Sequence, residues 1–270
     1  MIWHNGNIAP GNLLTYPRSS ESGWIYEVLR IKDHCPVFFK QHYDRLISGT
    51  KISGTSLRSS EHEILEGIFN LLNSAENSEG NIRIQVEIGS GTIMIGFIPH
   101  KYPDPEEFIK GVSTGTILME RTDPNIKTWN LNVREEADRI IKSSKLKEVI
   151  LLDNSGNLTE GSRSNIFAEK KGCLYTPPLA SVLPGITRQI IIDLANSLGI
   201  PVIEQTISYP DLESFDSFFL TGTSPGVLPI NIIDQYMFNN KSDKCALLRK
   251  AYENRIEENI KEIKQLYIQD

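Results

Sequence analysis

Apolar residues in the first hundred positions recur with the spacings of strands. Two apolar runs, 24–31 and 37–39, are separated by charged residues and Pro36, which predicts a hairpin. From 82 to 88, every second residue is isoleucine or valine and the residues between are polar, as in a strand with one polar face. A glycine-rich turn then leads to the apolar run 92–98, so a second hairpin is expected.

Helical spacing follows the first hairpin and recurs further on. We expect a helix over 40–52 and another after Ser60, which forms a capping-box pattern with Glu63. This second helix has an apolar stripe made of Ile64, Leu65, Ile68, Phe69, Leu71 and Leu72. Three prolines within 99–107 predict a rigid surface connection.

The remaining chain alternates between short strands and helices. Pro184-Gly185 precedes a predicted helix over 186–198, and apolar residues at helical spacing from Leu248 to Ile263 predict a closing helix. A further helix is expected over 133–145. The predicted strands are 112–119, 148–152, 165–168, 173–175, 202–206 and 217–220.

These elements predict an α+β protein with two domains. We place a small N-terminal domain at 1–115, an interdomain segment at 116–128 and a large C-terminal domain at 129–270. A chain of 270 residues is long enough for each domain to bury its own core.

Composition excludes several classes of protein. The net charge of −6 and the 39% hydrophobic residues argue against a disordered chain and a nucleic-acid partner. No apolar run approaches the roughly 18 residues that span a membrane, and residues 1–10 lack a signal-peptide pattern. Three distant cysteines with no metal-ligand spacing favour reduced thiols and a cytoplasmic protein.

Lys127 is the first candidate for chemistry. An arbitrary lysine is usually a solvated surface residue, but Lys127 lies at the proposed domain junction beside Ile126. An apolar cleft lowers the proton affinity of an amine, and the neutral amine is a nucleophile. Lys127 is therefore a candidate for Schiff-base chemistry.

Three further segments could hold a ligand. Glu160 is followed by small residues that let the backbone pass close to a ligand, although the segment could be an ordinary turn. The helix start at 183–188 (LPGITR) offers free N–H groups, and the turn at 221–224 (TGTS) offers hydroxyls. An amine, a carboxylate for a ring nitrogen and two phosphate-binding segments are together what pyridoxal 5′-phosphate requires.

The order of these motifs resembles the class IV, or fold-type IV, pyridoxal-phosphate aminotransferases. This family includes branched-chain aminotransferases, D-amino acid aminotransferases and aminodeoxychorismate lyases. The matching segments are 26–30 (YEVLR), 42–46 (HYDRL), 126–128 (IKT), 159–167 (TEGSRSNIF), 183–188 (LPGITR) and 219–229 (FLTGTSPGVLP). The resemblance implies a small N-terminal α/β sandwich and a larger C-terminal domain with a barrel-like sheet.

The resemblance also implies residue roles. Lys127 matches the catalytic lysine that carries the cofactor, and Glu160 matches the carboxylate paired with the pyridine nitrogen. The phosphate contacts match Arg45, Ile186, Thr187, Gly222 and Thr223, and the substrate side matches Tyr26, Arg83 and Ser224. Members of the family are usually homodimers that exchange an amino group between an amino acid and a 2-oxo acid.

Substrate preference is read from the strand that contains Arg83. This strand is most similar to that of branched-chain enzymes, so branched-chain or related L-amino acids are favoured. Ile88 stands where D-amino acid enzymes have an arginine, which counts against a D-amino acid aminotransferase. The pair Lys127-Thr128 is similar to that of the lyases, so an aminodeoxychorismate lyase that releases pyruvate stays an alternative. A cofactor-binding protein without transaminase activity is the most distant alternative.

Overall fold

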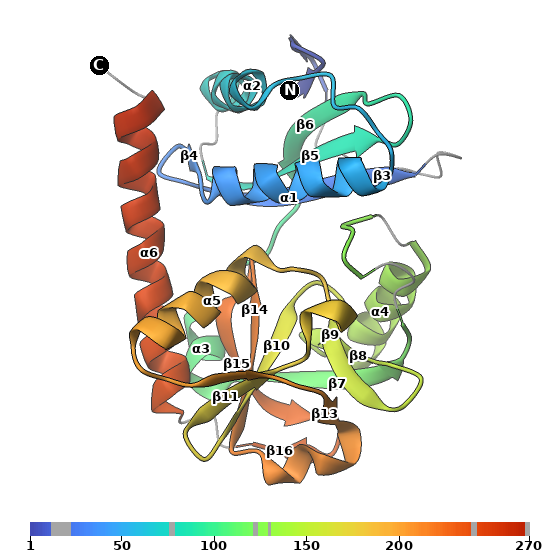
Figure 1. Cartoon of the computed structure of the whole chain (residues 1–270), viewed down its shortest axis with the longest axis vertical. Helices are drawn as coiled ribbons and strands as arrows, with labels where there is room; N and C mark the ends of the chain where they lie inside the picture. The colour runs from blue at the N-terminus through green and yellow to red at the C-terminus, as the bar shows by residue number, and fades with distance from the viewer. Residues whose placement is uncertain (12–22, 76–78, 121–123, 129–130, 239–241, 268–270) are drawn as a thin grey trace. The chain divides into compact units, whose positions relative to one another are not determined.

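The computed structural model describes residues 1–11, 23–75, 79–120, 124–128, 131–238 and 242–267. For residues 131 and 132 it describes the backbone alone. Residues 121–123 of the predicted interdomain segment therefore lie outside the described residues. The chain forms two compact units (Figure 1). Unit 1 comprises Met1–Lys101, Ile126–Trp129 and Asn254–Asp270, and unit 2 comprises Tyr102–Asn125 and Asn130–Glu253.

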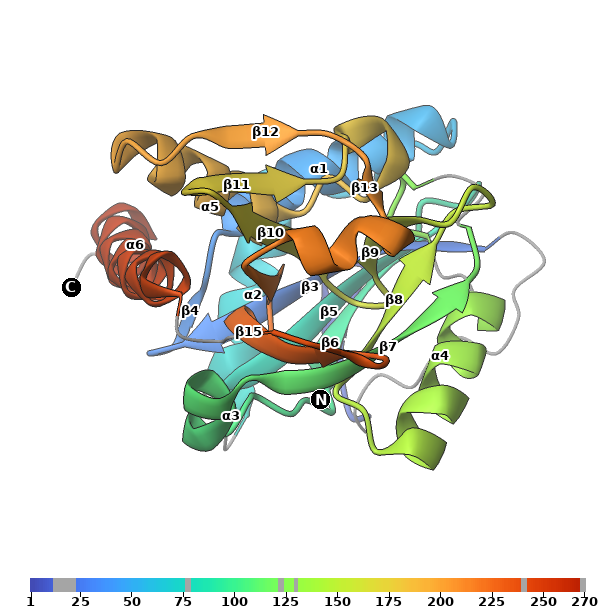
Figure 2. The same ribbon diagram turned by 90° about the horizontal axis from the view of Figure 1, so that it is seen from below.

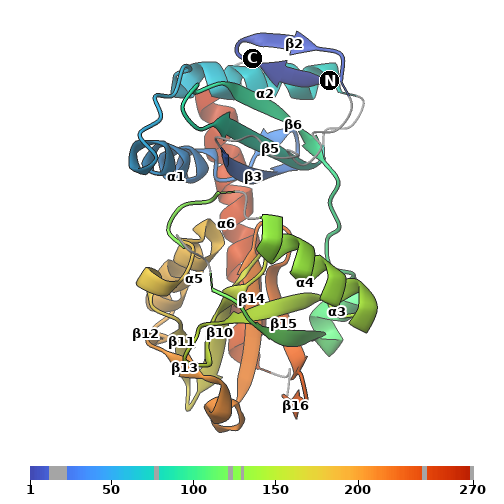
Figure 3. The same cartoon turned by 90° about the vertical axis from the view of Figure 1, so that its right-hand side faces the viewer.

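Unit 1 is built on a six-stranded antiparallel sheet with the order β2-β1-β6-β5-β3-β4. Helices α1 (Phe39–Ile52) and α2 (Glu61–Ser74) contribute apolar side chains to the same core as one face of this sheet (Figure 3). The strands are β1 (Ile2–His4), β2 (Asn7–Ala9), β3 (Trp24–Lys32), β4 (Cys35–Pro36), β5 (Gly80–Glu87) and β6 (Ile93–Ile98).

Strand alternation divides the unit 1 sheet into two faces. Ile25, Leu29 and Ile31 of β3 belong to the buried core, together with the alternate residues Ile84 and Val86 of β5. Because successive side chains point to opposite faces, the residues between them point away from this core. We call that second surface the polar face.

Unit 2 is built on a ten-stranded mixed sheet with the order β12-β11-β10-β14-β15-β7-β8-β9-β13, and β16 pairs with β15. The sheet curls around an apolar core (Figure 2). Its strands are β7 (Val112–Leu118), β8 (Glu148–Leu152), β9 (Asn157–Gly161), β10 (Asn165–Lys170), β11 (Cys173–Thr176), β12 (Val202–Glu204), β13 (Ile207–Ser208), β14 (Ser217–Gly222), β15 (Gly226–Ile233) and β16 (Tyr236–Met237).

Four α-helices accompany the strands of the second half. They are α3 (Pro105–Lys110), α4 (Leu131–Ser144), α5 (Ile186–Ser197) and α6 (Asp243–Tyr267), and two short 3₁₀ helices cover Leu179–Ser181 and Tyr209–Ser214. Within the described ranges, no helix is both long and apolar enough to cross a membrane. The mixed helices and curled sheets confirm the predicted α+β fold class.

One local prediction is wrong, and one predicted connection contains the start of a helix that was not predicted. The apolar run 37–39 is not a strand, because β4 ends at Pro36 and Phe38 takes a left-handed conformation (φ 56°) as the residue before α1. Its apolar character reflects burial, since Val37 and Phe38 are each 2% exposed. The connection 99–107 contains the start of α3, where Pro105 takes the first helical position and Asp104 forms a capping box with Glu107.

Several strands are absent from the sequence-based expectations. The strands β1, β2, β9, β13, β15 and β16 are short, or they contain residues that are unfavourable in strands. Glu160 was expected between two strands, but it lies within β9. Pro229 lies inside β15, where the sequence pattern indicated only a motif after a strand.

Candidate active site

The segment that carries Lys127 lies alongside β3 within unit 1. The backbone N–H of Tyr26 donates to the carbonyl oxygen of Lys127 at 3.0 Å, and Ile25 forms an antiparallel bridge with Thr128. Ile126 packs against the unit 1 core. Alternation therefore turns the next residue, Lys127, towards the polar face. Its Nζ lies 5.1 Å from the centroid of the Tyr26 ring, and the side chain is partly exposed.

Three of the predicted residues share this polar face. Tyr26 is directly opposite Gln85 in the pairing of β3 with β5, and Val28 is directly opposite Arg83. Residues directly opposite each other in an antiparallel pair point to the same face. Tyr26 and Arg83 are 2% and 1% exposed. The structure thus brings Tyr26, Arg83 and Lys127 onto one surface of unit 1, although they come from three distant segments.

Arg45 lies in a charged cluster on the opposite, core-facing side of β3. Its Nε donates to Oε1 of Glu27 at 2.8 Å, and Nη2 donates to Oε2 at 2.6 Å. His42 Nδ1 lies 2.7 Å from the same Oε2. This fork holds the guanidinium of Arg45 in a fixed direction, and its binding of phosphate stays a prediction.

The charges of this cluster follow from its burial. Burial disfavours the charged carboxylate of Glu27, but the charge and hydrogen bonds of Arg45, with the bond from His42, outweigh it and lower the pKa to about 2. Burial lowers the pKa of His42, against the attraction of Glu27. His42 is therefore neutral at pH 7, and its Nδ1–H donates to Glu27.

Glu160 has a different environment in unit 2. It is 3% exposed, and its Oε2 accepts hydrogen bonds from the backbone N–H of Leu183 at 3.1 Å and from Nδ2 of Asn165 at 3.4 Å. Asn165 also donates from Nδ2 to the carbonyl oxygen of Leu183 at 3.0 Å. Both of these donors are neutral groups, and a carboxylate has about four lone-pair sites that can accept hydrogen bonds.

The start of α5 is packed against the same asparagine. A Cβ added to Gly185, the residue before α5, would lie 1.9 Å from Oδ1 of Asn165. The close approach therefore requires glycine. The first backbone N–H groups of a helix have no partner within the helix, so Ile186 and Thr187 present donors at this end. The hydroxyl of Thr187 lies 3.2 Å from that of Tyr252.

The third unit 2 motif reaches Asn165 from the other side. In the pairing of β10 with β14, Thr221 is directly opposite Asn165, so both side chains share one face of the sheet. Gly222 ends β14, and Thr223 and Ser224 form the turn that leads to β15. Three segments predicted separately thus converge on Asn165, which the sequence reasoning had not selected.

Two more residues of this region, Thr221 of the predicted turn and Glu148, were not singled out individually from the sequence. Oγ1 of Thr221 is buried and has no hydrogen-bond partner within the described parts of the chain. Glu148 is 6% exposed and fixes the loop between β9 and β10. Its Oε1 accepts from Oγ of Ser162 at 2.6 Å and from the backbone N–H of Val149 at 2.9 Å. Its Oε2 accepts from Oγ of Ser164 at 3.0 Å and from the backbone N–H of Arg163 at 3.3 Å. The sequence signal for this loop is the run of small residues that follows Glu160.

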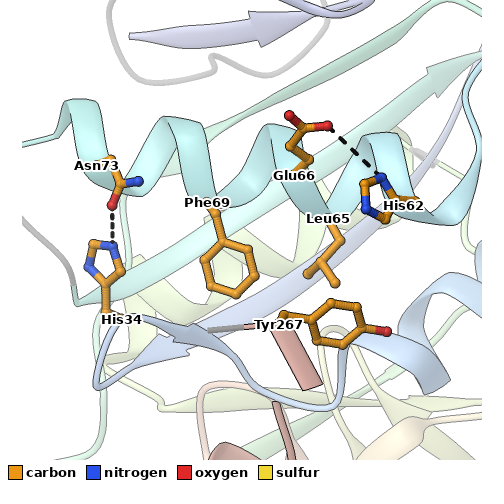
Figure 4. A pocket seen from close by; sticks show the side chains of 7 residues that line it. All are labelled: His34, His62, Leu65, Glu66, Phe69, Asn73 and Tyr267. Atoms are coloured by element: carbon orange, nitrogen blue, oxygen red, sulfur yellow. Dashed lines mark hydrogen bonds and ion pairs between the residues drawn. The ribbon is translucent and has the colours of Figure 1, made fainter. Parts of the chain in front are cut away.

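Unit 1 also has a surface pocket of about 330 Å³ that contains none of the predicted residues. In Figure 4, His34 faces Asn73 and His62 faces Glu66, with Leu65, Phe69 and Tyr267 between them. Among the described residues, no cluster of histidine, cysteine and acidic side chains could hold a metal ion. This pocket therefore offers neither an amine nor a metal site for the predicted chemistry.

Comparison with known proteins identifies the family. The family model described as amino-transferase class IV matches residues 24–233. A putative branched-chain-amino-acid aminotransferase of Methanocaldococcus jannaschii is 30% identical over 80% of this chain and 81% of its own. The aminodeoxychorismate lyase of Bacillus subtilis is 27% identical over 87% of each chain.

Solved structures agree with this assignment. The crystal structure of a putative branched-chain amino acid aminotransferase from Thermotoga maritima has a TM-score of 0.83 and 30% identity, and the match covers 95% of each chain. The branched-chain amino acid aminotransferase of Escherichia coli has a TM-score of 0.81 and 25% identity. The resemblance stated from the motifs is confirmed: this chain belongs to the class IV aminotransferase family.

Proposed function

We propose that this enzyme binds pyridoxal 5′-phosphate and exchanges an amino group between an amino acid and a 2-oxo acid. Branched-chain or related L-amino acids are the preferred substrates, as the names of the relatives in Methanocaldococcus jannaschii and Thermotoga maritima suggest. The observation that carries the proposal is the placement of the Lys127 amine beside Tyr26 on the polar face, with Arg83 on the same surface.

The donor set of each unit fits this cofactor. In unit 2, the buried carboxylate of Glu160 suits a protonated ring nitrogen, and the first turn of α5 suits a phosphate. The hydroxyl of Thr221, which has no hydrogen-bond partner among the described residues, can donate to a further acceptor. In unit 1, Lys127 offers an amine for covalent attachment. When bound, the cofactor supplies an aldehyde carbon and an electron-withdrawing ring.

The residues of the chain then divide the work. We propose that Lys127 carries the cofactor and moves a proton to and from the α-carbon of the substrate, which requires a neutral Nζ. Glu160 keeps the ring nitrogen protonated. Arg45, Ile186, Thr187, Gly222 and Thr223 bind the phosphate, and Tyr26, Arg83 and Ser224 contact the substrate.

A lysine substitution tests the central role. We expect Lys127→Ala to stay folded, to lose the visible absorbance band of covalently attached cofactor and to lower turnover by at least about 100-fold. The control is Lys110→Ala, whose amine pairs with Glu106 in an exposed position. A band that persists in Lys127→Ala would assign the attachment to another lysine.

One specific observation supports a lyase as second candidate. The Bacillus subtilis relative that covers 87% of this chain is an aminodeoxychorismate lyase. The discriminating experiment supplies aminodeoxychorismate without any amino acceptor and measures pyruvate. Release of pyruvate identifies a lyase, whereas conversion of the cofactor spectrum by leucine identifies a transaminase. Conversion by D-alanine alone would exclude the branched-chain preference.

The proposal also includes a cytoplasmic homodimer. The homodimer rests on the family resemblance, and light scattering of the purified protein measures its mass. Cys35, Cys173 and Cys245 are all free thiols, which is consistent with a reducing compartment.

A further inference from the structure

Gln85 is a buried polar residue on the polar face that no motif selected. It lies in β5, directly opposite Tyr26 of β3 on one side and Met94 of β6 on the other. Its side chain is 4% exposed. Residues 84 and 86 of the same strand belong to the apolar core, so Gln85 alternates with them to face away from it.

The amide of Gln85 has unused hydrogen-bonding capacity. Its Nε2 lies 3.7 Å from the sulfur of Met94, which is a weak acceptor. Its Oε1 is buried and finds no hydrogen-bond partner in the described ranges of the chain. Buried amides in folded proteins are normally paired, so this one calls for an explanation.

A purely structural role does not explain this choice of residue. Leucine or methionine would fill a similar volume at this position without burying an unpaired carbonyl group. The same face carries Lys127 at its partly exposed edge and Arg83 one alternate position away on β5. The surface around Gln85 therefore suits a polar or anionic group better than an aliphatic one.

We propose that Gln85 determines specificity by hydrogen bonding to the side chain of a substrate that carries a carboxylate or a carboxamide. This inference rests on the proposed transaminase function, in which two different substrates must be accepted in turn. An amide offers two donors and one acceptor, so it can pair with either group. Aliphatic substrates make no such bond and do not depend on Gln85.

The test compares three amino acids in the holoenzyme. Single-turnover rate constants are measured with glutamate, with glutamine and with leucine for the wild type and for Gln85→Leu. We expect Gln85→Leu to lower the ratio of the glutamate to the leucine rate constant by at least about tenfold. The measurement with glutamine shows whether Gln85 recognises a carboxamide as well as a carboxylate.

Binding of unreactive analogues gives a second readout. The dissociation constants of glutarate and 4-methylvalerate are measured by titration of the same proteins. We expect Gln85→Leu to weaken glutarate binding by at least about tenfold and to change 4-methylvalerate binding by less than about threefold. Gln41→Leu is the matched control, because Gln41 of α1 also has a buried, unpaired Oε1 but lies on a helix.

The outcomes separate this inference from the proposed function. Two ratios decide the role of Gln85: the glutamate-to-leucine ratio of rate constants and the glutarate-to-4-methylvalerate ratio of dissociation constants. If folded Gln85→Leu keeps both within about twofold of the wild type, Gln85 does not contact the substrate side chain. If the wild type reacts with no amino acid, the proposed function fails, and the glutarate titration still decides the role of Gln85. Gln85→Met, which keeps the length but not the amide, replaces the leucine variant if that variant does not fold.

Discussion

Two buried carboxylates, Glu27 of unit 1 and Glu148 of unit 2, are satisfied by different kinds of donor. Glu27 is bonded by the guanidinium of Arg45 and the ring of His42. Glu148 is bonded by two hydroxyls and two backbone N–H groups. The first arrangement balances a charge with a charge, and the second spreads the compensation over four neutral dipoles.

The difference shows what each carboxylate positions. Glu27 orients two side chains, Arg45 and His42, so its effect is confined to these two neighbours. Glu148 fixes a stretch of backbone, the loop 161–164 that joins Glu160 to Asn165. A Cβ on Gly161 would lie 2.2 Å from Ser164 Oγ, so a side chain at this position would displace the hydroxyl that donates to Glu148. Substitution of the two carboxylates should therefore lower the unfolding free energy by different amounts and loosen different parts of the chain.

The largest effect is expected for Glu27→Gln. The substitution removes the charge that balances the partly buried guanidinium of Arg45, which costs about 3–5 kcal/mol of unfolding free energy. Chemical denaturation measures the loss, and hydrogen exchange should localise it to α1 and β3. The control is Asp44→Asn, which breaks an exposed pair with Lys40 and should cost less than about 1 kcal/mol. Equal losses in both variants would contradict the comparison.

A smaller loss is expected for Glu148→Gln. Each carboxylate oxygen accepts a hydrogen bond from one backbone N–H group. The NH₂ group of glutamine would therefore face a backbone donor in either orientation of the amide, and one hydrogen bond would be lost. We expect a cost of about 1–3 kcal/mol and faster hydrogen exchange in the loop 161–164. A stability equal to that of the wild type, with unchanged exchange, would show that the four hydrogen bonds do not hold the loop.

The mildest effect is the response of unit 1 to acid. The pKa of His42 is lowered by burial in the folded state, with Arg45 and Lys127 opposing and Glu27 favouring its protonation. The unfolded chain therefore binds this proton at a higher pH, and stability falls as the pH drops below about 6.5, by at most about 1.4 kcal/mol per pH unit. Because the pKa of Glu27 is lowered to about 2, a further loss follows between about pH 4.5 and pH 2.

Unfolding free energies of the wild type and of His42→Gln between pH 8 and pH 5 check this expectation. Glutamine keeps a donor for Glu27 but does not titrate, so the slope in this range should disappear in the variant. A slope that persists would assign the acid response to another group.

Long, strongly periodic segments could be predicted from the sequence. The helix after Ser60 and the strand 148–152 were predicted with nearly the observed bounds, because local propensity and the apolar pattern agree there. The strand around Pro229 and the left-handed turn at Phe38 could not be predicted. Pairing with β14 in the first case, and burial in the second, overrule the local preference.

The family follows from the amino-acid sequence alone, through motifs whose order and spacing match the chemistry predicted for Lys127 and Glu160. The folded chain is needed to see that Tyr26, Arg83 and Lys127 share a face with Gln85, and that three motifs meet at Asn165. The physical reason is that strand register and side-chain alternation are set by packing across the sheet, which brings together residues far apart in the chain.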